Sequence, residues 1–253
     1  MKAILTPKWI AAHVVVVVIA IVFINLGFWQ LSRLEERQLE NQIAESRYAD
    51  PPDDLSALIT AAGDDLESLQ YRRATVTGTY DPEHEVLTRN QVYREQAGFH
   101  VVTPLVTEGG GAVLVNRGWV PLPLDTPPID EAAPQSGQVT ISGWINPTQT
   151  RPALGPTDPA GGVLDVMSRI NIDRIQQQMP YDLAPVYLVL EGDGGDALPV
   201  ALPPPEFSDE GSHLAYAIQW FGFTLTGVIG YWFLIRKTLA QSTRKSSVPR
   251  SER

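Results

Sequence analysis

The chain has 253 residues, a formal net charge of −10, four histidines and no cysteine. Without cysteine it forms no disulfide, carries no covalently attached c-type haem and performs no thiol chemistry. Its charge is unevenly divided: residues 1–31 and 236–253 together carry +7, whereas residues 32–213 carry 11 arginines and 28 acidic side chains. The acidic middle argues against nucleic-acid binding, because phosphate binding needs a basic face.

The first predicted element is a transmembrane helix over residues 9–31, which contain no ionised side chain. At about 1.5 Å per residue, a helix of this length crosses the roughly 30 Å hydrocarbon core of a bilayer. A cleaved signal peptide is the alternative, but this run exceeds a signal's apolar region and charged residues follow it. Residues 1–8 precede the span, and residues 33–48 continue it as a polar helix that stops before Pro51-Pro52.

Residues 32–212 are predicted to form one β-rich domain. A short helix over residues 55–63 comes first, and from Tyr71 onward apolar and polar residues alternate with the period of a half-buried strand. We expect strands at 71–80, 85–90, 99–106, 112–120, 139–145, 163–170 and 186–191, with a short helix at 173–179. Antiparallel pairing with small helices is the arrangement that these elements favour.

A second transmembrane helix is predicted over residues 213–235, followed by a basic tail over 236–253. Short basic flanks stay on the cytoplasmic side, so both termini are expected in the cytoplasm and the acidic domain outside it. No mitochondrial presequence precedes the first span, which favours a bacterial plasma membrane. The predicted fold class is an α+β membrane protein, in which two transmembrane helices flank one extracytoplasmic antiparallel β domain with short helices.

Enzyme signatures are missing from the sequence. It has no G-x-S-x-G elbow, P-loop, G-x-G-x-x-G loop or H-E-x-x-H motif. The paired carboxylates Asp53-Asp54 and Asp64-Asp65 stand at helix-cap and turn positions, where a solvated surface is the favoured interpretation. We therefore expect a protein that is not an enzyme.

His213 begins a stripe of residues along the second span. Spacings of 3, 4, 7, 11, 14 and 18 from it place on one helix face Tyr216, Ala217, Trp220, Thr224, Gly227 and Tyr231. Spacing alone favours packing against the first span, because small residues permit close approach. The alternative is a groove for a large apolar ring, with a neutral imidazole at its top that binds iron.

Other polar residues of the spans have simpler interpretations. His13 is predicted as an interfacial residue that reaches the lipid headgroups. Asn25 and Gln219 lie at similar depth, and polar residues inside spans need partners. We therefore expect a hydrogen bond between them that joins the two helices.

Five stretches of the sequence resemble the surfeit-locus-one (Shy-type) cytochrome c oxidase assembly factors. They are LGFWQLSR at 26–33, YRRATVTGTY at 71–80, GFHVVTPL at 98–105, VLVNRGWVP at 113–121 and HLAYAIQWFGF at 213–223. The stretches follow the family's order over nearly the whole chain, with two spans around a β domain. One departure is Glu36-Arg37, where family members commonly carry an aromatic and a basic residue.

The resemblance implies an assembly factor that binds haem a and assists its insertion into the catalytic subunit of a haem–copper cytochrome c oxidase. The family's proposed haem ligand is the histidine of its H-L-x-Y-A-x-Q-W-F motif. That histidine corresponds here to His213, which would bind the haem iron. Tyr216, Ala217 and Trp220 would then face the ring.

Arg33 and Arg37 would pair with the haem propionates in this interpretation. Salt bridges to Glu36 or Glu40 are the favoured alternative. The implied partners are the lipid bilayer, the oxidase subunits, especially the haem-bearing one, and the haem a synthesis enzyme. An accessory subunit that stays with the oxidase complex and holds no cofactor is the other function left open.

The stretch Asn116-Arg117-Gly118-Trp119 belongs to the resemblance but has no assigned chemistry. Arg117 shares a predicted strand face with Val113 and Val115. We expect a buried, hydrogen-bonded arginine that holds a loop.

Overall fold

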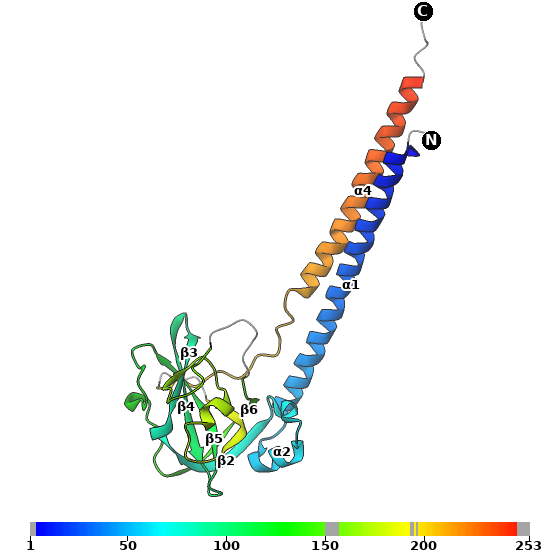
Figure 1. Cartoon of the computed structure of the whole chain (residues 1–253). Helices are drawn as coiled ribbons and strands as arrows, with labels where there is room; N and C mark the ends of the chain where they lie inside the picture. The colour runs from blue at the N-terminus through cyan, green and yellow to red at the C-terminus, as the bar shows by residue number, and fades with distance from the viewer. Residues whose placement is uncertain (1–3, 150–156, 193–194, 196, 247–253) are drawn as a thin grey trace, which may run out of the picture. The chain divides into compact units, whose positions relative to one another are not determined.

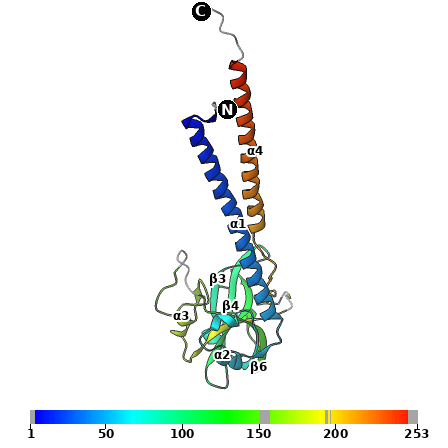
Figure 2. The ribbon, with the colours of Figure 1, turned by 90° about the vertical axis from the view of Figure 1, so that its right-hand side faces the viewer.

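Two long helices from the ends of the chain, α1 (Pro7–Ala49) and α4 (His213–Ser246), lie side by side and antiparallel (Figures 1 and 2). The computed structural model describes residues 4–149, 157–192, 195 and 197–246. Met1–Gln42 and Ser208–Arg253 form one structural unit, and Ile43–Phe207 form the other. Both helices are long and apolar enough to cross a membrane.

The helices extend beyond their apolar runs. α1 continues without a break through the polar stretch predicted to lengthen it and ends at Ala49. Pro51 and Pro52 follow, and a proline has no backbone N–H for a further helical turn. α4 likewise passes its predicted apolar limit at residue 235 and continues to Ser246.

The second unit is built around one sheet. Within the described residues its strands are β1 (Asp53–Asp54), β2 (Arg73–Tyr80), β3 (Val86–Tyr93), β4 (Gln96–Val106), β5 (Ala112–Pro121), β6 (Gln138–Pro147), β7 (Val166–Met167) and β8 (Leu183–Leu190). Short helices between them are α2 (Leu55–Ala62), η2 (Leu66–Leu69), η3 (Pro82–His84), η4 (Asp130–Ala132) and α3 (Ile172–Gln176). The β-rich domain predicted from alternation is therefore present.

The sheet closes into a small barrel. Its strands follow the order β2-β6-β8-β5-β4, and β4 returns to β2 where Thr79 pairs with Val106 and Tyr80 with Leu105. β3 and β7 extend the sheet beyond β4, and β1 adds to β2. Closure pairs strands that would otherwise be exposed edges.

The expectation of an antiparallel sheet is only partly confirmed: β2–β4, β2–β6, β3–β4, β4–β5 and β6–β8 are antiparallel pairs, but three other pairs are not. β5 and β8 run parallel, with Leu114 opposite Tyr187, and β1–β2 and β3–β7 are also parallel pairs. Parallel neighbours need a long crossover connection, which β6, β7 and α3 supply between β5 and β8. The barrel is therefore mixed.

The strand predicted over residues 163–170 is also shorter than expected. Only Val166–Met167 pair with β3. The next backbone N–H, that of Ser168, donates to the carboxylate of Asp158, and that of Ile170 donates to the Gln149 side chain. Side-chain acceptors thus replace the partner strand.

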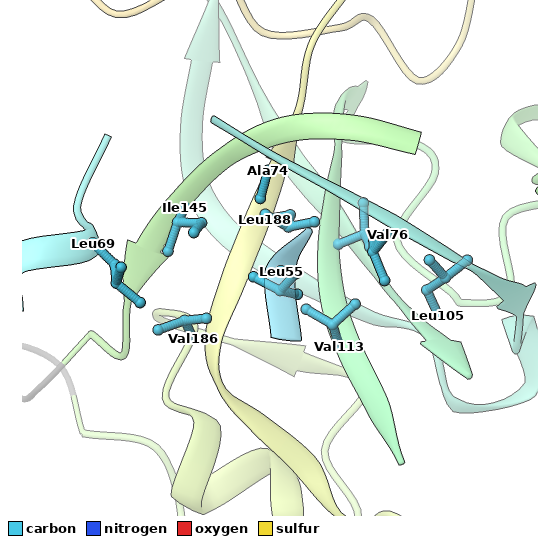
Figure 3. Close-up of a cluster of buried hydrophobic side chains, with 10 residues drawn as sticks. Leu55, Leu69, Ala74, Val76, Leu105, Val113, Ile145, Val186 and Leu188 are labelled. Atoms are coloured by element: carbon cyan, nitrogen blue, oxygen red, sulfur yellow. The ribbon is translucent and has the colours of Figure 1, made fainter. Parts of the chain in front are cut away.

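Alternate residues of the barrel strands fill its interior (Figure 3). The buried cluster comprises Leu55, Leu69, Ala74, Val76, Leu105, Val113, Val115, Ile145, Val186 and Leu188. Leu55 comes from α2, which therefore contributes to the core. Asp54 begins this helix by accepting the Ala57 N–H at 3.0 Å, which confirms a capping position for the Asp53-Asp54 pair.

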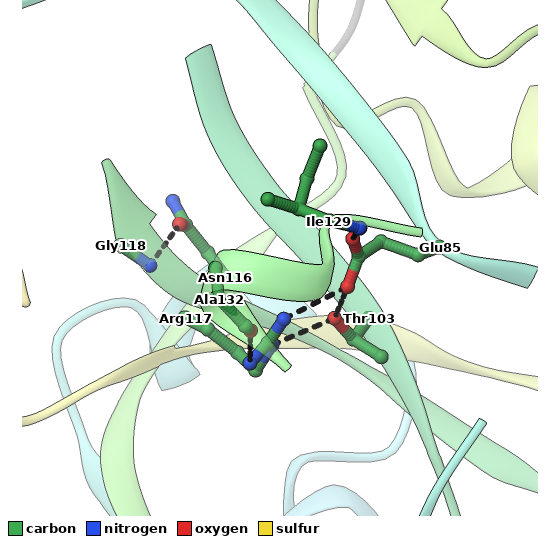
Figure 4. A network of polar contacts seen from close by, with 7 residues as sticks. All are labelled: Glu85, Thr103, Asn116, Arg117, Gly118, Ile129 and Ala132. Carbon is green, nitrogen blue, oxygen red and sulfur yellow. Dashed lines mark hydrogen bonds and ion pairs between the residues drawn. The ribbon is translucent and has the colours of Figure 1, made fainter. Parts of the chain in front are cut away.

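Arg117 is buried and holds a loop, as predicted (Figure 4). Its guanidinium donates to Glu85 Oε2 at 2.8 Å, Thr103 Oγ1 at 2.8 Å and the Ala132 carbonyl at 2.7 Å. The other carboxylate oxygen of Glu85 accepts the Ile129 N–H at 3.0 Å. This network fastens the proline-rich segment 121–134 to the strands.

Candidate functional site

Small residues bring α1 and α4 close together near His213. A Cβ atom at Gly27 would lie 2.5 Å from Cε1 of Phe221, so any larger residue there would displace that ring. Phe28 contacts the same ring edge-on, with centroids 5.5 Å apart. Ala217 is 1% exposed. Close approach through small side chains is typical of paired helices in membranes.

The His213 imidazole is oriented by a residue of α1. Its Nδ1 lies 2.9 Å from Oε1 of Gln30. Because Oε1 accepts, Nδ1 carries the proton, and the neutral ring keeps its lone pair on Nε2. Nε2 forms no hydrogen bond within the described part of the chain. Histidines that bind metals are commonly oriented through their other nitrogen in this way.

Gly211 keeps the Nε2 edge of His213 clear. Its φ angle is +66°, and a Cβ atom there would lie 3.5 Å from Nε2 and 3.4 Å from Cδ2. Its N–H donates to Asp209 Oδ1 at 2.8 Å, which fixes the turn before α4. A side chain at position 211 would therefore stand beside the atom with the free lone pair.

The three other predicted ring-facing residues differ in their surroundings. Tyr216 is 48% exposed, whereas Ala217 is buried. Trp220 packs against Phe23 of α1, with ring centroids 5.2 Å apart. The structure therefore brings Tyr216 to the surface beside His213, while Ala217 and Trp220 contribute to contact between the helices.

Arg33 forms the salt bridge that the sequence favoured. Its Nη1 lies 2.6 Å from Glu36 Oε2, and the guanidinium carbon lies 5.8 Å from the centre of the Trp29 ring. Arg37 pairs with Glu40 at 3.1 Å. All four charged side chains are at least half exposed.

His13, which the sequence predicts at the lipid headgroups, forms hydrogen bonds within the helix pair. The Tyr231 hydroxyl lies 2.7 Å from its Nδ1, and the Ile4 carbonyl lies 3.1 Å from its Nε2. Because the carbonyl can only accept, Nε2 donates to it and Nδ1 accepts from Tyr231. A second imidazole thus joins the helices, far from His213.

Asn25 does not form the expected bond to Gln219. Its amide donates to the Ile21 carbonyl of its own helix at 2.7 Å. Among the described residues, side-chain hydrogen bonds that join the two helices are those of His213 with Gln30 and of Tyr231 with His13.

Sequence reasoning missed Gln30 as the partner of His213. The available signal was its place at the end of the first apolar run, where a half-buried amide needs a partner. It also missed the fit between Gly27 and Phe221, because nothing in one sequence shows which faces of two helices meet.

The barrel offers no comparable centre. A hollow of about 860 Å³ lies between α2 and the 107–111 turn, and its polar lining includes Asp54, Glu108 and Asp182. The described residues contain no group of three or more histidine and carboxylate side chains that could hold a metal ion.

Known proteins are similar to this chain over most of its length. A sequence model of the SURF1 family matches residues 17–225. A SURF1-like protein of Mycobacterium bovis is 32% identical over 251 residues, which cover 97% of this chain and 90% of that protein. A SURF1-like protein of Rickettsia conorii is 27% identical over 87% of this chain and 89% of its own length. The chain therefore belongs to the SURF1 family.

Proposed function

We propose that this protein binds haem a through His213 and assists its insertion into the catalytic subunit of a haem–copper cytochrome c oxidase. Family membership supports the assembly role. One observation carries the haem-binding part: Gln30 fixes the His213 tautomer that leaves Nε2 free for a metal. A neutral imidazole of this kind is a common axial ligand of haem iron.

The surroundings of His213 fit a haem carried as cargo. Gly211 places no side chain beside Nε2, and the half-exposed Tyr216 ring offers an aromatic surface about one turn along α4. Arg33 and Arg37 lie about one and two helical turns beyond Gln30. Their exposed salt bridges are worth less than about 1 kcal/mol each, so exchanging a glutamate for a haem propionate costs little.

We place both helices across a bacterial plasma membrane, with the β domain outside the cytoplasm. The long apolar helices and the basic ends of the chain support this placement. His213 then stands at the outer boundary of its span. A ligand there suits haem a, whose isoprenoid tail belongs in lipid and whose propionates belong near water.

The test is the haem content of the protein purified from cells that make haem a. We expect His213→Ala to lose most of its haem while it still inserts into the membrane. His13→Ala is the matched control, because it also removes an imidazole hydrogen bond between the helices. Unchanged haem content and an unchanged spectrum in His213→Ala would exclude His213 as the ligand.

The burial of Ala217 favours a second candidate function, an accessory subunit that uses this face only for packing and holds no cofactor. Such a subunit would purify with the mature oxidase in a constant ratio and without haem. An assembly factor would be found with immature oxidase subunits and be absent from the finished complex.

A further inference from the structure

We infer that a groove between α1 and α4 receives the isoprenoid tail of the haem, so that the protein selects tailed haems over haem b. This inference rests on the proposed haem binding at His213. It gives a function to the groove, which plays no part in binding the iron.

The groove has a volume of about 550 Å³ and is almost wholly apolar. Its walls include Val16, Ala20 and Phe23 of α1 and Phe223, Gly227 and Leu234 of α4. Three residues of the lining, Thr224, Thr226 and Tyr231, carry hydroxyl groups. Two of these are already bonded: Thr224 donates to the Trp220 carbonyl, and Tyr231 donates to His13. The groove therefore offers an apolar ligand shape and contact area, with those two polar groups satisfied.

Two glycines of α4 keep this groove open. A Cβ atom at Gly227 or Gly230 would meet no heavy atom within 4 Å, in contrast to Gly27 beneath Phe221. Packing of the helices thus does not require glycine at either position. Glycine is a poorer helix former than alanine, so each of these residues lowers the stability of the helix interior. Space for a ligand gives these residues a purpose.

The groove continues the face of α4 that carries Tyr216. Spacings of 7, 11 and 18 residues place Phe223, Gly227 and Leu234 below Tyr216 on the same helix face. Gly227 lies 14 residues from His213, or about 21 Å along the helix. A haem bound at His213 with its tailed edge directed along α4 extends the tail past Trp220 and into the groove.

Shape is what favours an isoprenoid over an ordinary lipid chain. Lipid is as apolar as the groove, so the hydrophobic effect does not drive binding inside a bilayer, and close packing does. A farnesyl chain carries methyl branches at regular intervals. The open spaces at Gly227 and Gly230 accept such branches, and the rings of Phe23 and Phe223 flank the entry.

The experiment compares haem b, which has a vinyl group in place of the tail, with haem o and haem a. Full-length protein without haem is purified in detergent and titrated with each haem for the wild type, Gly227→Leu and Gly222→Leu. Gly222 also has open space around it but lies on the opposite face of α4. We expect Gly227→Leu to weaken binding of the tailed haems about five-fold or more, because leucine fills the groove. Haem b binding should stay unchanged, and Gly222→Leu should match the wild type.

The outcomes separate this inference from the proposed function. If the wild type binds none of the haems, haem binding at His213 fails and the groove loses its ligand with it. If Gly227→Leu binds every haem like the wild type, or weakens haem b as much as haem a, the tail site is wrong while haem binding stands. Loss of a co-purifying membrane polypeptide without any change in haem preference would instead make the groove a helix-docking face.

Discussion

Gln30 shows how a residue on one helix sets the chemistry that His213 offers on the other. Its Oε1 accepts a hydrogen bond from Nδ1–H of His213 and so decides which nitrogen presents a lone pair. The amide also fixes the plane of the imidazole relative to α1. Such outer partners commonly account for a tenfold or greater share of metal affinity.

We therefore predict that Gln30→Ala weakens haem binding about ten-fold without abolishing it. His213 remains, but its ring rotates freely and both tautomers become available. Gln30→Glu should restore affinity and lower the reduction potential of the bound haem, because a carboxylate makes the imidazole a stronger donor. Haem titration and spectroelectrochemistry measure the two effects. Asn25→Ala is the control, since that amide bonds within its own helix; equal losses in both variants would contradict the role of Gln30.

His100 of β4 gives the β domain a dependence on pH. Burial lowers the pKa of this imidazole to about 4, and Asn116 donates to its Nδ1 at 3.2 Å. An unfolded histidine titrates near pH 6.5. Between about pH 6.5 and 4 the unfolded chain therefore binds one more proton than the folded domain, and stability falls as pH falls.

We predict that His100→Gln makes the free energy of unfolding less dependent on pH within this window. The difference in slope between wild type and variant should approach about 1.4 kcal/mol per pH unit. Above pH 7 the two slopes should coincide, because both states hold a neutral side chain at position 100. Denaturant unfolding at several pH values measures this, and parallel curves at all pH values would rule out His100 as the titrating group.

At the scale of elements, the Arg117 network holds the segment that contains η4 to the barrel wall. Arg117→Ala would leave the Glu85 carboxylate buried without its cation. We predict a loss of about 3–5 kcal/mol in the stability of the β domain. The exposed pair of Arg37 and Glu40 supplies the control, because Arg37→Ala should cost less than about 1 kcal/mol. Thermal unfolding monitored by circular dichroism compares the two variants. Similar losses of stability would show that the buried network stabilises the β domain no more than an exposed ion pair does.

Elements with a clear period were predictable from the sequence, and their pairing was not. Alternation located β2, β4, β5, β6 and β8 to within a few residues. The predicted strand ended at residue 90, whereas β3 continues to Tyr93. The turn that follows β3 is made by Arg94 and Glu95, which have positive φ angles. Asparagine and glycine are the usual sequence signal for such a turn, so the sequence did not mark its place. The closure of β4 on β2 and the parallel neighbours β5 and β8 depend on contacts far apart in the chain, which no local pattern encodes.

At the scale of the whole molecule, the charge distribution makes a prediction about topology. Reporter fusions after residue 31 and at residue 253 should report opposite sides of the membrane, with the C-terminus in the cytoplasm. Removing the basic residues Arg236 and Lys237 should weaken this preference. Identical compartments for the two fusions would exclude two crossings.

The candidate site was partly predictable at this scale. The position of His213 at the start of an apolar helix was visible in the sequence, and the resemblance gave it a role. Its partner lies 183 residues away on the other helix. A single sequence does not show that two residues this far apart in the chain lie in contact in the fold.

The separation of α1 from α4 by the whole β domain also has a consequence for synthesis. In a bilayer, His13 and Gln30 of α1 find their interhelical partners only when Tyr231 and His213 have been made. His213 follows Gln30 by 183 residues, which takes roughly ten to forty seconds to translate at typical rates. During that interval His13 and Gln30 of a membrane-inserted α1 are without these partners. Unpartnered polar side chains favour retention of α1 beside the insertion machinery. The contacts of His213 with Gln30 and of Tyr231 with His13 therefore form only after α4 has been made, and a chain truncated before α4 lacks both.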